Sequence, residues 1–226
     1  MDGNGRWASL RQQSRTFGHR RAEKAIRNSV NYCLANGVLA LTLYAFSTEN
    51  WQRSKREVAF IMTLLLDFLK KSRQLLMENQ IKLAWIGRRD KIPKEVRALF
   101  EEIIEQTKHH QNMTLCLAVD YGSKGEIMSA IKKITSLVKS GDMQPAEVSE
   151  NLLESMLDTK DLPPLDLLVR TSGEFRLSNF LLWQAAYAEL YFCDTLWPDF
   201  DEKELAKAFA SYSARSRRWG KIMNFI

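Results

Sequence analysis

Cysteine is scarce in this 226-residue sequence, and the three that occur lie far apart among apolar residues: Cys33, Cys116 and Cys193. Their odd number and their spacing fit neither a zinc site nor a disulfide framework. We therefore expect three buried free thiols and a reducing compartment. No apolar run reaches the roughly 18–20 residues that span a bilayer, and no secretory signal is visible. These absences predict a cytoplasmic protein. They are also compatible with a protein that works at a membrane surface.

The charge balance is mildly basic, with 33 Lys and Arg against 27 Asp and Glu and a formal net charge of +6. This excess favours anionic ligands or an anionic membrane surface as partners. Most arginines near the two ends of the chain lie inside motifs rich in glycine and serine. A basic stripe interleaved with stacking aromatics is missing, which argues against nucleic acid as the ligand. Since 45% of the residues are hydrophobic and 27% charged, the chain should fold as one globular domain over residues 1–226.

Strand-like and helix-like segments alternate along the chain, which predicts an α/β fold. Expected strands are 38–46, 81–86, 113–119, 165–169 and 190–192, and expected helices are 18–36, 57–77, 93–109, 124–139 and 202–215, with short helices in 141–160. The run from Val38 to Phe46 is almost continuously apolar, as in a strand buried on both faces. Strands separated by helices predict a central, mostly parallel sheet with helices on both faces. Ligands bind such sheets at the carboxyl ends of the strands.

Two motifs about 170 residues apart combine glycine with arginine: 2–7 near the start of the chain and 170–180 near its end. Glycine lets backbone N–H groups approach an anion, and guanidinium groups match diphosphate oxygens. The carboxylate of Asp2 belongs to the first motif, and that of Glu189 follows the second. Together they suggest two diphosphates and a divalent cation in one site. Taken alone, the Asp-Gly-Asn-Gly run is equally typical of a tight turn.

Two further segments carry polar groups at places where a site would use them. Arg15 and His19 lie at the start of a predicted helix, where an anion is favoured, although an isolated histidine there is more often a surface or capping residue. The segment 47–51, with Arg53 close behind, follows the strand that ends at Phe46. It fits either a connecting loop with a packing tryptophan or a cluster that orients a reacting group.

Taken together, these segments resemble the cis-prenyltransferase family, the undecaprenyl diphosphate synthases. The resemblance covers nearly the whole chain and rests on seven segments in order: 1–8, 15–19, 41–53, 170–184, 187–192, 196–200 and 217–220. It implies the α/β fold of that family with a hydrophobic tunnel. The Asp-Asp-x-x-Asp motif of the all-helical trans-prenyltransferases does not occur in this sequence. The cis class therefore fits better.

The resemblance also implies roles for individual residues. Asp2 would be the key catalytic aspartate, engaging Mg²⁺ with Glu189 as a second metal ligand, and Asn50 and Ser47 would orient the condensation or accept its proton. The residues implied to bind substrate are Gly3, Asn4, Gly5, Arg6, Trp7, Arg15, His19, Thr48, Glu49, Trp51, Arg53, Arg170, Arg176, Leu177 and Ser178. The allylic diphosphate, such as farnesyl diphosphate, would be held by Gly3, Asn4, Gly5, Arg6, Arg15 and His19. The diphosphate of isopentenyl diphosphate would be bound by Arg170, Arg176 and Ser178.

The implied product is a long Z-polyprenyl diphosphate such as undecaprenyl diphosphate, the precursor of a lipid carrier for cell-wall glycans. A shorter product and a non-catalytic subunit of a two-component synthase are the alternatives. The family is homodimeric, and Arg217, Arg218 and Gly220 are expected near the active site and the subunit interface. Two departures from the family pattern stand out. The usual strand before Met1 is not in the sequence. The segment 120–124 reads Asp-Tyr-Gly-Ser-Lys where relatives usually carry Asn-Tyr-Gly-Gly-Arg, and the loss of the second glycine and of the arginine is expected to change the loop shape and the local charge.

Overall fold

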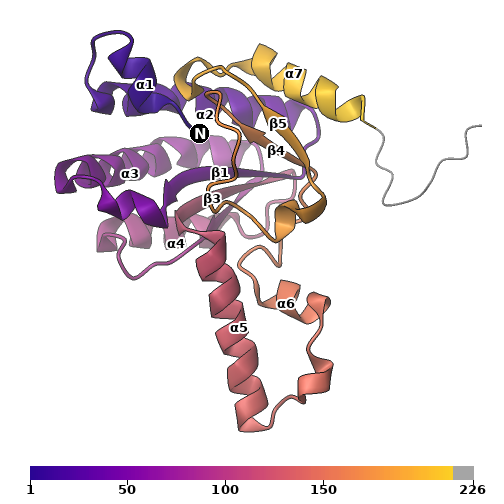
Figure 1. Ribbon diagram of the computed structural model, residues 1–226. Helices are drawn as coiled ribbons and strands as arrows, with labels where there is room; N and C mark the ends of the chain where they lie inside the picture. Colours follow the sequence, from indigo (N-terminus) through magenta and orange to yellow (C-terminus); the bar gives the residue numbers. More distant parts are fainter. Residues whose placement is uncertain (216–226) are drawn as a thin grey trace, which may run out of the picture.

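The computed structural model describes residues 1–215, in which five strands form two parallel sheets flanked by helices (Figure 1). The larger sheet has the order β1-β3-β2, and the smaller pairs β4 with β5. The strands are β1 (Ala40–Ser47), β2 (Ile81–Ile86), β3 (Met113–Tyr121), β4 (Leu167–Arg170) and β5 (Glu189–Phe192). The main helices are α1 (Asn4–Ser9), α2 (Arg15–Ala35), α3 (Lys55–Glu78), α4 (Lys94–Thr107), α5 (Ser123–Ser140), α6 (Glu150–Met156) and α7 (Glu202–Ser213). The predicted α/β class and the parallel pairing are confirmed.

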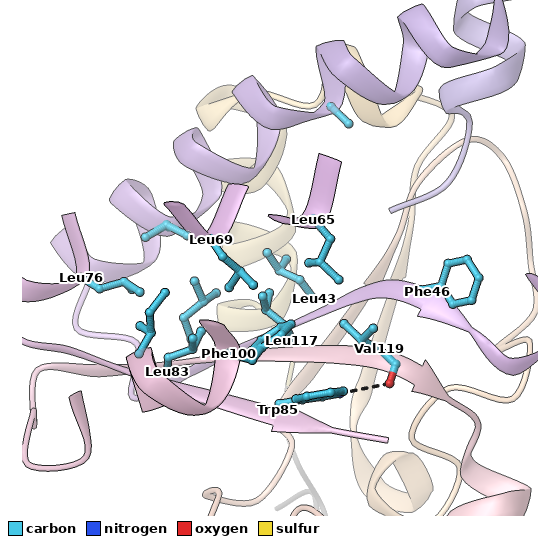
Figure 2. Packing of buried hydrophobic residues seen from close by; sticks show 14 of the residues in the cluster. Leu43, Phe46, Leu65, Leu69, Leu76, Leu83, Trp85, Phe100, Leu117 and Val119 are labelled. Atoms are coloured by element: carbon cyan, nitrogen blue, oxygen red, sulfur yellow. Dashed lines mark hydrogen bonds between the residues drawn. The ribbon is translucent and has the colours of Figure 1, made fainter. Parts of the chain in front are cut away.

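The main core lies between the larger sheet and helices α3 and α4 (Figure 2). Its buried residues are 0–9% exposed and include Leu65, Leu69, Leu76, Leu83, Phe100 and Leu117. Burying one such side chain stabilises the fold by about 1.5–3 kcal/mol. The apolar residues of α3 recur at helical spacing and so share one face of the helix, and the same holds for α4. Each helix therefore lies flat against the strands.

The strand buried on both faces is β3 and not β1, where the sequence predicted it. Eight of the nine residues of β3 are buried, all except Thr114, whereas only Leu43 and Phe46 are buried in β1. The reason is the strand order, because β3 is central while β1 pairs along one side only. An unbroken apolar run identifies a buried strand but not its place in the sheet.

The second face of the larger sheet is covered mainly by loop residues. Cys116, Ala118 and Tyr121 pack there against Leu181, with Leu162, Leu165 and Phe180 around them. A side chain of α4 satisfies one backbone N–H at the unpaired edge of β2. The hydroxyl of Thr107 accepts the Leu83 N–H at 3.0 Å. Helix α5 begins at the end of β3 and projects away from the rest of the molecule (Figure 1).

The helices that border the site begin earlier than the sequence predicted. Helix α2 begins at Arg15 and not at Gly18, because the Ser14 hydroxyl accepts the Phe17 N–H and caps the helix. Ser54 caps α3 in the same way. All three cysteines are free, as predicted, but only Cys33 and Cys116 are buried, whereas Cys193 is half-buried. Within residues 1–215, no helix is long and apolar enough to cross a membrane. Arg217, Arg218 and Gly220 lie outside the described residues.

Candidate active site

The two glycine–arginine motifs meet at Asp2. Its carboxylate accepts a hydrogen bond from Arg170, with 2.9 Å between Arg170 Nη2 and Asp2 Oδ2, and a second from the Gly3 N–H at 2.8 Å. The Thr171 hydroxyl forms two hydrogen bonds with the backbone of Asp2. It accepts from the Asp2 N–H and donates to the Asp2 C=O, each at 3.0 Å. Partial burial opposes ionisation of Asp2, but the bonds from Arg170 and Gly3 hold its pKa below the ordinary value. The structure therefore brings together ends of the chain 168 residues apart.

Arg6 lies beside Asp2 and also contacts the second motif. Its guanidinium donates to the backbone and the hydroxyl of Ser172 at 3.0 and 2.6 Å, and it pairs with Glu174 at 2.8 Å. Gly3 is required where the chains touch, since it has a φ of 99° and a Cβ there would lie 2.8 Å from Leu196 and 3.0 Å from Ser172. Neither Ser172 nor Glu174 was singled out from the sequence, although both lie within the second motif.

The second motif folds back so that Ser178 also reaches Arg170. Arg170 Nη1 lies 2.8 Å from the Ser178 hydroxyl and also donates to the backbone carbonyl of Arg176. The side chain of Arg176 is 61% exposed and pairs with Glu174. Leu177 is half-buried within the same turn. The predicted group of Arg170, Arg176 and Ser178 is thus assembled around one guanidinium.

A second basic cluster forms around Glu57, a residue that the sequence analysis missed. Oε1 of this one carboxylate lies 3.0 Å from Arg53, 3.4 Å from Arg15 and 3.5 Å from His19 Nε2. Burial opposes ionisation of Glu57, but Arg15, Arg53 and His19 hold its pKa below the ordinary value. The only signal in the sequence is that Glu57 follows Arg53 by four residues, a common ion-pair spacing.

The first motif touches this second cluster as well. The guanidinium of Arg15 packs on Gly5, where a Cβ would lie 2.9 Å from its Nη1. Gly18 packs still more closely on the backbone of Asn4, where a Cβ would lie 2.0 Å from the carbonyl oxygen. Among the described residues, Asn4 Oδ1 is buried without a hydrogen-bond partner, and the buried His19 Nε2 has only the long contact of 3.5 Å to Glu57. Buried polar atoms without partners are typical of a site that a ligand completes.

His19 is held mostly in the neutral form. Burial first, and then the nearby Arg53 guanidinium, lower the pKa of His19, while Glu57 acts in the opposite direction. Trp7 lies behind this cluster, stacked on Phe17 at 5.9 Å between ring centroids. Its indole is buried and packs between α1 and α2, and its Nε1 has no hydrogen-bond partner among the described residues. A neutral imidazole can still donate one hydrogen bond to a phosphate oxygen.

The Ser47–Trp51 segment follows β1 and forms a short helical turn, Thr48–Gln52. The Asn50 side chain accepts the Ser47 N–H at 3.1 Å, which fixes the orientation of its amide. Glu49 accepts a hydrogen bond from Asn179 at 3.0 Å and so ties this turn to the second motif. Thr48 lies against Gly122, where a Cβ would come within 2.8 Å of its hydroxyl. The three motifs therefore converge on one region, as predicted.

Glu189 does not join Asp2 within the chain. It is the first residue of β5 and pairs with Leu167 at the start of β4, whereas Arg170 and Asp2 lie at the other end of that parallel pair. Its carboxylate instead contacts Arg215 at 2.5 Å. No group of three or more metal-ligating side chains occurs among residues 1–215. A divalent cation held by Asp2 would need oxygen ligands from the substrate.

The sequence and fold have clear relatives among known proteins. The family model described as "Putative undecaprenyl diphosphate synthase" matches residues 1–220. The "Isoprenyl transferase" of Fusobacterium nucleatum is 45% identical over 99% of this chain and 94% of its own, and that of Zymomonas mobilis is 46% identical over 98% and 90%.

Solved structures agree with this assignment. Lavandulyl diphosphate synthase from Lavandula x intermedia, in complex with dimethylallyl diphosphate, is 34% identical with a TM-score of 0.94, covering 98% of this chain and 95% of its own. A probable undecaprenyl diphosphate synthase from Campylobacter jejuni is also 34% identical, with a TM-score of 0.77 over 89% and 92%. With these likenesses along nearly its whole length, the chain belongs to the undecaprenyl diphosphate synthase family of cis-prenyltransferases.

Proposed function

We propose that this prenyltransferase condenses isopentenyl diphosphate with an allylic diphosphate, farnesyl diphosphate being the expected primer. The observation that carries the proposal is the pair of basic clusters on either side of the first motif. Arg6 and Arg170 lie on one side, and Arg15, His19 and Arg53 on the other. Two adjacent clusters of guanidinium groups suit two diphosphates, one for each substrate.

Mg²⁺ is the expected cofactor, and the residues present fit it. Asp2 has a carboxylate held in its ionised form beside both clusters, and Mg²⁺ commonly takes one or two protein carboxylates together with substrate phosphates and water. In this proposal Asp2 would hold the ion, and Glu189 of the same chain would not. When bound, the ion would neutralise charge that develops on a leaving diphosphate.

The chain's own residues would bind, orient and stabilise charge. Ionisation of an allylic diphosphate places negative charge on the leaving group, which the arginines of a cluster can stabilise without rearrangement. The double bond of isopentenyl diphosphate must then lie close to the allylic carbon, which requires positioning more than a strong base. Asn50, with its amide fixed by Ser47, would orient rather than accept the proton.

The product is proposed to be long, of the undecaprenyl type, since the family model and the Campylobacter jejuni structure are both described as undecaprenyl diphosphate synthases. The high TM-score with a lavandulyl diphosphate synthase keeps a short product as the second candidate. We also propose a homodimer acting in the cytoplasm with peripheral membrane contact. Exposed apolar side chains on and beside α5, such as Met128, Ile131 and Val148, support a second copy of the chain as their partner.

The test is incorporation of radiolabelled isopentenyl diphosphate into farnesyl or dimethylallyl diphosphate with and without Mg²⁺, with products separated by length. The wild-type protein should extend the primer, and Asp2→Ala should lose at least about 100-fold in turnover because the bonded carboxylate is removed. Asp142→Ala, which removes a carboxylate beside Ser140 at the far end of α5, is the matched control and should behave as wild type. Wild-type turnover by Asp2→Ala, or no extension by a folded dimer, would reject the proposal.

A further inference from the structure

Asp120 is a fully buried carboxylate for which the proposed reaction has so far no use. It lies at the end of β3, is 0% exposed, and adopts the left-handed backbone conformation with a φ of 49°. Asparagine and aspartate tolerate this conformation better than most residues. Its backbone carbonyl accepts the Arg88 N–H at 3.1 Å, and Gly87 packs so closely on the strand end that a Cβ would lie 2.3 Å from the Val119 carbonyl oxygen.

The carboxylate of Asp120 receives hydrogen bonds from two separate segments. The indole Nε1 of Trp51 donates to Oδ1 at 2.7 Å. Arg88 donates from Nη2 to Oδ1 at 2.8 Å and from Nε to Oδ2 at 3.2 Å. An ionised carboxylate can accept all three bonds, whereas an asparagine side chain has a single carbonyl oxygen and also brings two donors. Asparagine could accept the bonds from Trp51 and Arg88 Nη2 at its one carbonyl oxygen, but only as weaker neutral bonds, and its NH₂ group would face Arg88 Nε with a second donor.

The support under Asp120 is rigid. Trp85 donates its indole N–H to the carbonyl of Val119, the preceding residue, at 3.1 Å (Figure 2). Trp51 packs edge-on against Phe46 at 5.0 Å between ring centroids. The indole of Trp51 is thus held by the Phe46 ring on one side and by Asp120 at its nitrogen. It lies between the Ser47–Asn50 turn and Arg53, which belongs to the Glu57 cluster.

We propose that Asp120 is a positioning residue that acts on the reaction through Trp51, with Arg88 as its balancing charge. This inference rests on the proposed function, because Trp51 matters for turnover only if the surrounding motifs bind the substrates. By fixing the indole, Asp120 sets the path of the chain from Asn50 to Arg53. Through Arg88, the turn after β2 would therefore help to hold Asp120, and with it Trp51, in place.

A purely structural role for Asp120 is the competing explanation, and a double-mutant cycle separates the two. Asp120→Asn should lower kcat/KM for isopentenyl diphosphate about tenfold when Trp51 is present. In a Trp51→Phe background, where the indole N–H is gone, the same substitution should cost less than twofold. An equal loss in both backgrounds, or no loss in Asp120→Asn, would overturn the proposal. Thermal unfolding of all four proteins confirms that each is folded under the assay conditions.

Arg88→Ala is the second variant should Asp120→Asn fail to fold. It should reduce kcat/KM several-fold only when Trp51 is present. Arg89→Ala is its matched control, because Arg89 carries the same charge but stacks on the Trp85 ring at 4.7 Å and does not contact Asp120. Arg89→Ala should remain within twofold of wild type. An equal loss in Arg88→Ala and Arg89→Ala would attribute the effect to charge alone and overturn the proposal.

A measurement independent of turnover separates this inference from the proposed function. The indole N–H of Trp51 can be assigned by ¹⁵N NMR, as the one of six tryptophan signals that Trp51→Phe removes. In Asp120→Asn it should move upfield, while the Trp85 signal stays in place. A Trp51 signal that does not move refutes the contact even if the enzyme is active. Failure of wild-type condensation, with the expected shift present, refutes the proposed function instead.

Discussion

Gly18→Ala tests whether the close packing of α2 on the first motif controls activity. A Cβ at Gly18 would lie 2.0 Å from the carbonyl oxygen of Asn4 and 2.9 Å from its carbon. Ordinary van der Waals contact begins near 3.4 Å, so the two backbones must separate by about 1.4 Å. Neither group is the end of a flexible side chain. The strain must therefore move either α2 or the motif that contains Asp2.

The expected loss of activity is larger than the expected loss of stability. Misplacing catalytic groups by about 1 Å costs on the order of 100-fold, so kcat/KM should fall at least that much. Overpacking costs about 1–3 kcal/mol, but alanine is favoured over glycine inside a helix by about 1 kcal/mol. The net destabilisation of Gly18→Ala should be about 0–2 kcal/mol, which lowers the midpoint of thermal unfolding by roughly 2–4 °C per kcal/mol.

Gly125→Ala is the matched control, since it makes the same substitution in α5, where nothing lies within 4 Å of the new Cβ. This variant should keep its kcat/KM within twofold and gain up to about 1 kcal/mol of stability. Steady-state kinetics and thermal unfolding on both variants decide the matter. A folded Gly18→Ala protein whose kcat/KM stays within threefold of wild type would show that the contact between α2 and Asn4 does not govern the site.

Two further predictions concern a titrating group and a buried hydroxyl. Since Glu57 raises the pKa of His19, Glu57→Gln should move the His19 midpoint in an NMR titration further below that of an ordinary histidine, and an upward move would contradict the electrostatic assignment. Thr107→Val should cost about 1–3 kcal/mol in urea denaturation, because it leaves the buried Leu83 N–H unpaired and removes the bond to the Ile103 carbonyl. Wild-type stability in Thr107→Val would mean that the edge of β2 does not depend on this hydroxyl.

Residue types alone predicted which side chains of the two glycine–arginine motifs meet. Arginine and glycine in short motifs indicate where an anion can approach, and Arg6, Arg170 and Ser178 do converge beside Asp2. The strands were also identified, because apolar runs bounded by helices leave few alternatives. Helix starts were less accurate: α2 begins three residues before the predicted Gly18, since a serine cap outweighs the first apolar residue.

The misses share a physical cause, which is that they depend on partners distant in sequence. Glu57 is the first residue of the helix predicted at 57–77, and its contact with the site appears only when Arg15 is brought to it across 42 residues. Asp120 was noted as unusual, but its partner Arg88 lies 32 residues away. For Glu189, the motif order gave no information on which end of a parallel strand pair the residue occupies, and it lies at the end opposite Asp2.

The carboxylates around the site explain why so much positive charge can be gathered before any substrate binds. Three arginines of the site are each paired with an acid: Arg170 with Asp2, Arg6 with Glu174 and Arg53 with Glu57. Unpaired guanidinium groups this close together would repel one another and move apart. The acids hold the arginines in place at modest cost, because half-exposed ion pairs are weak. A diphosphate, which has more charge and more acceptor oxygens than one carboxylate, can then take over these donors without rebuilding the site.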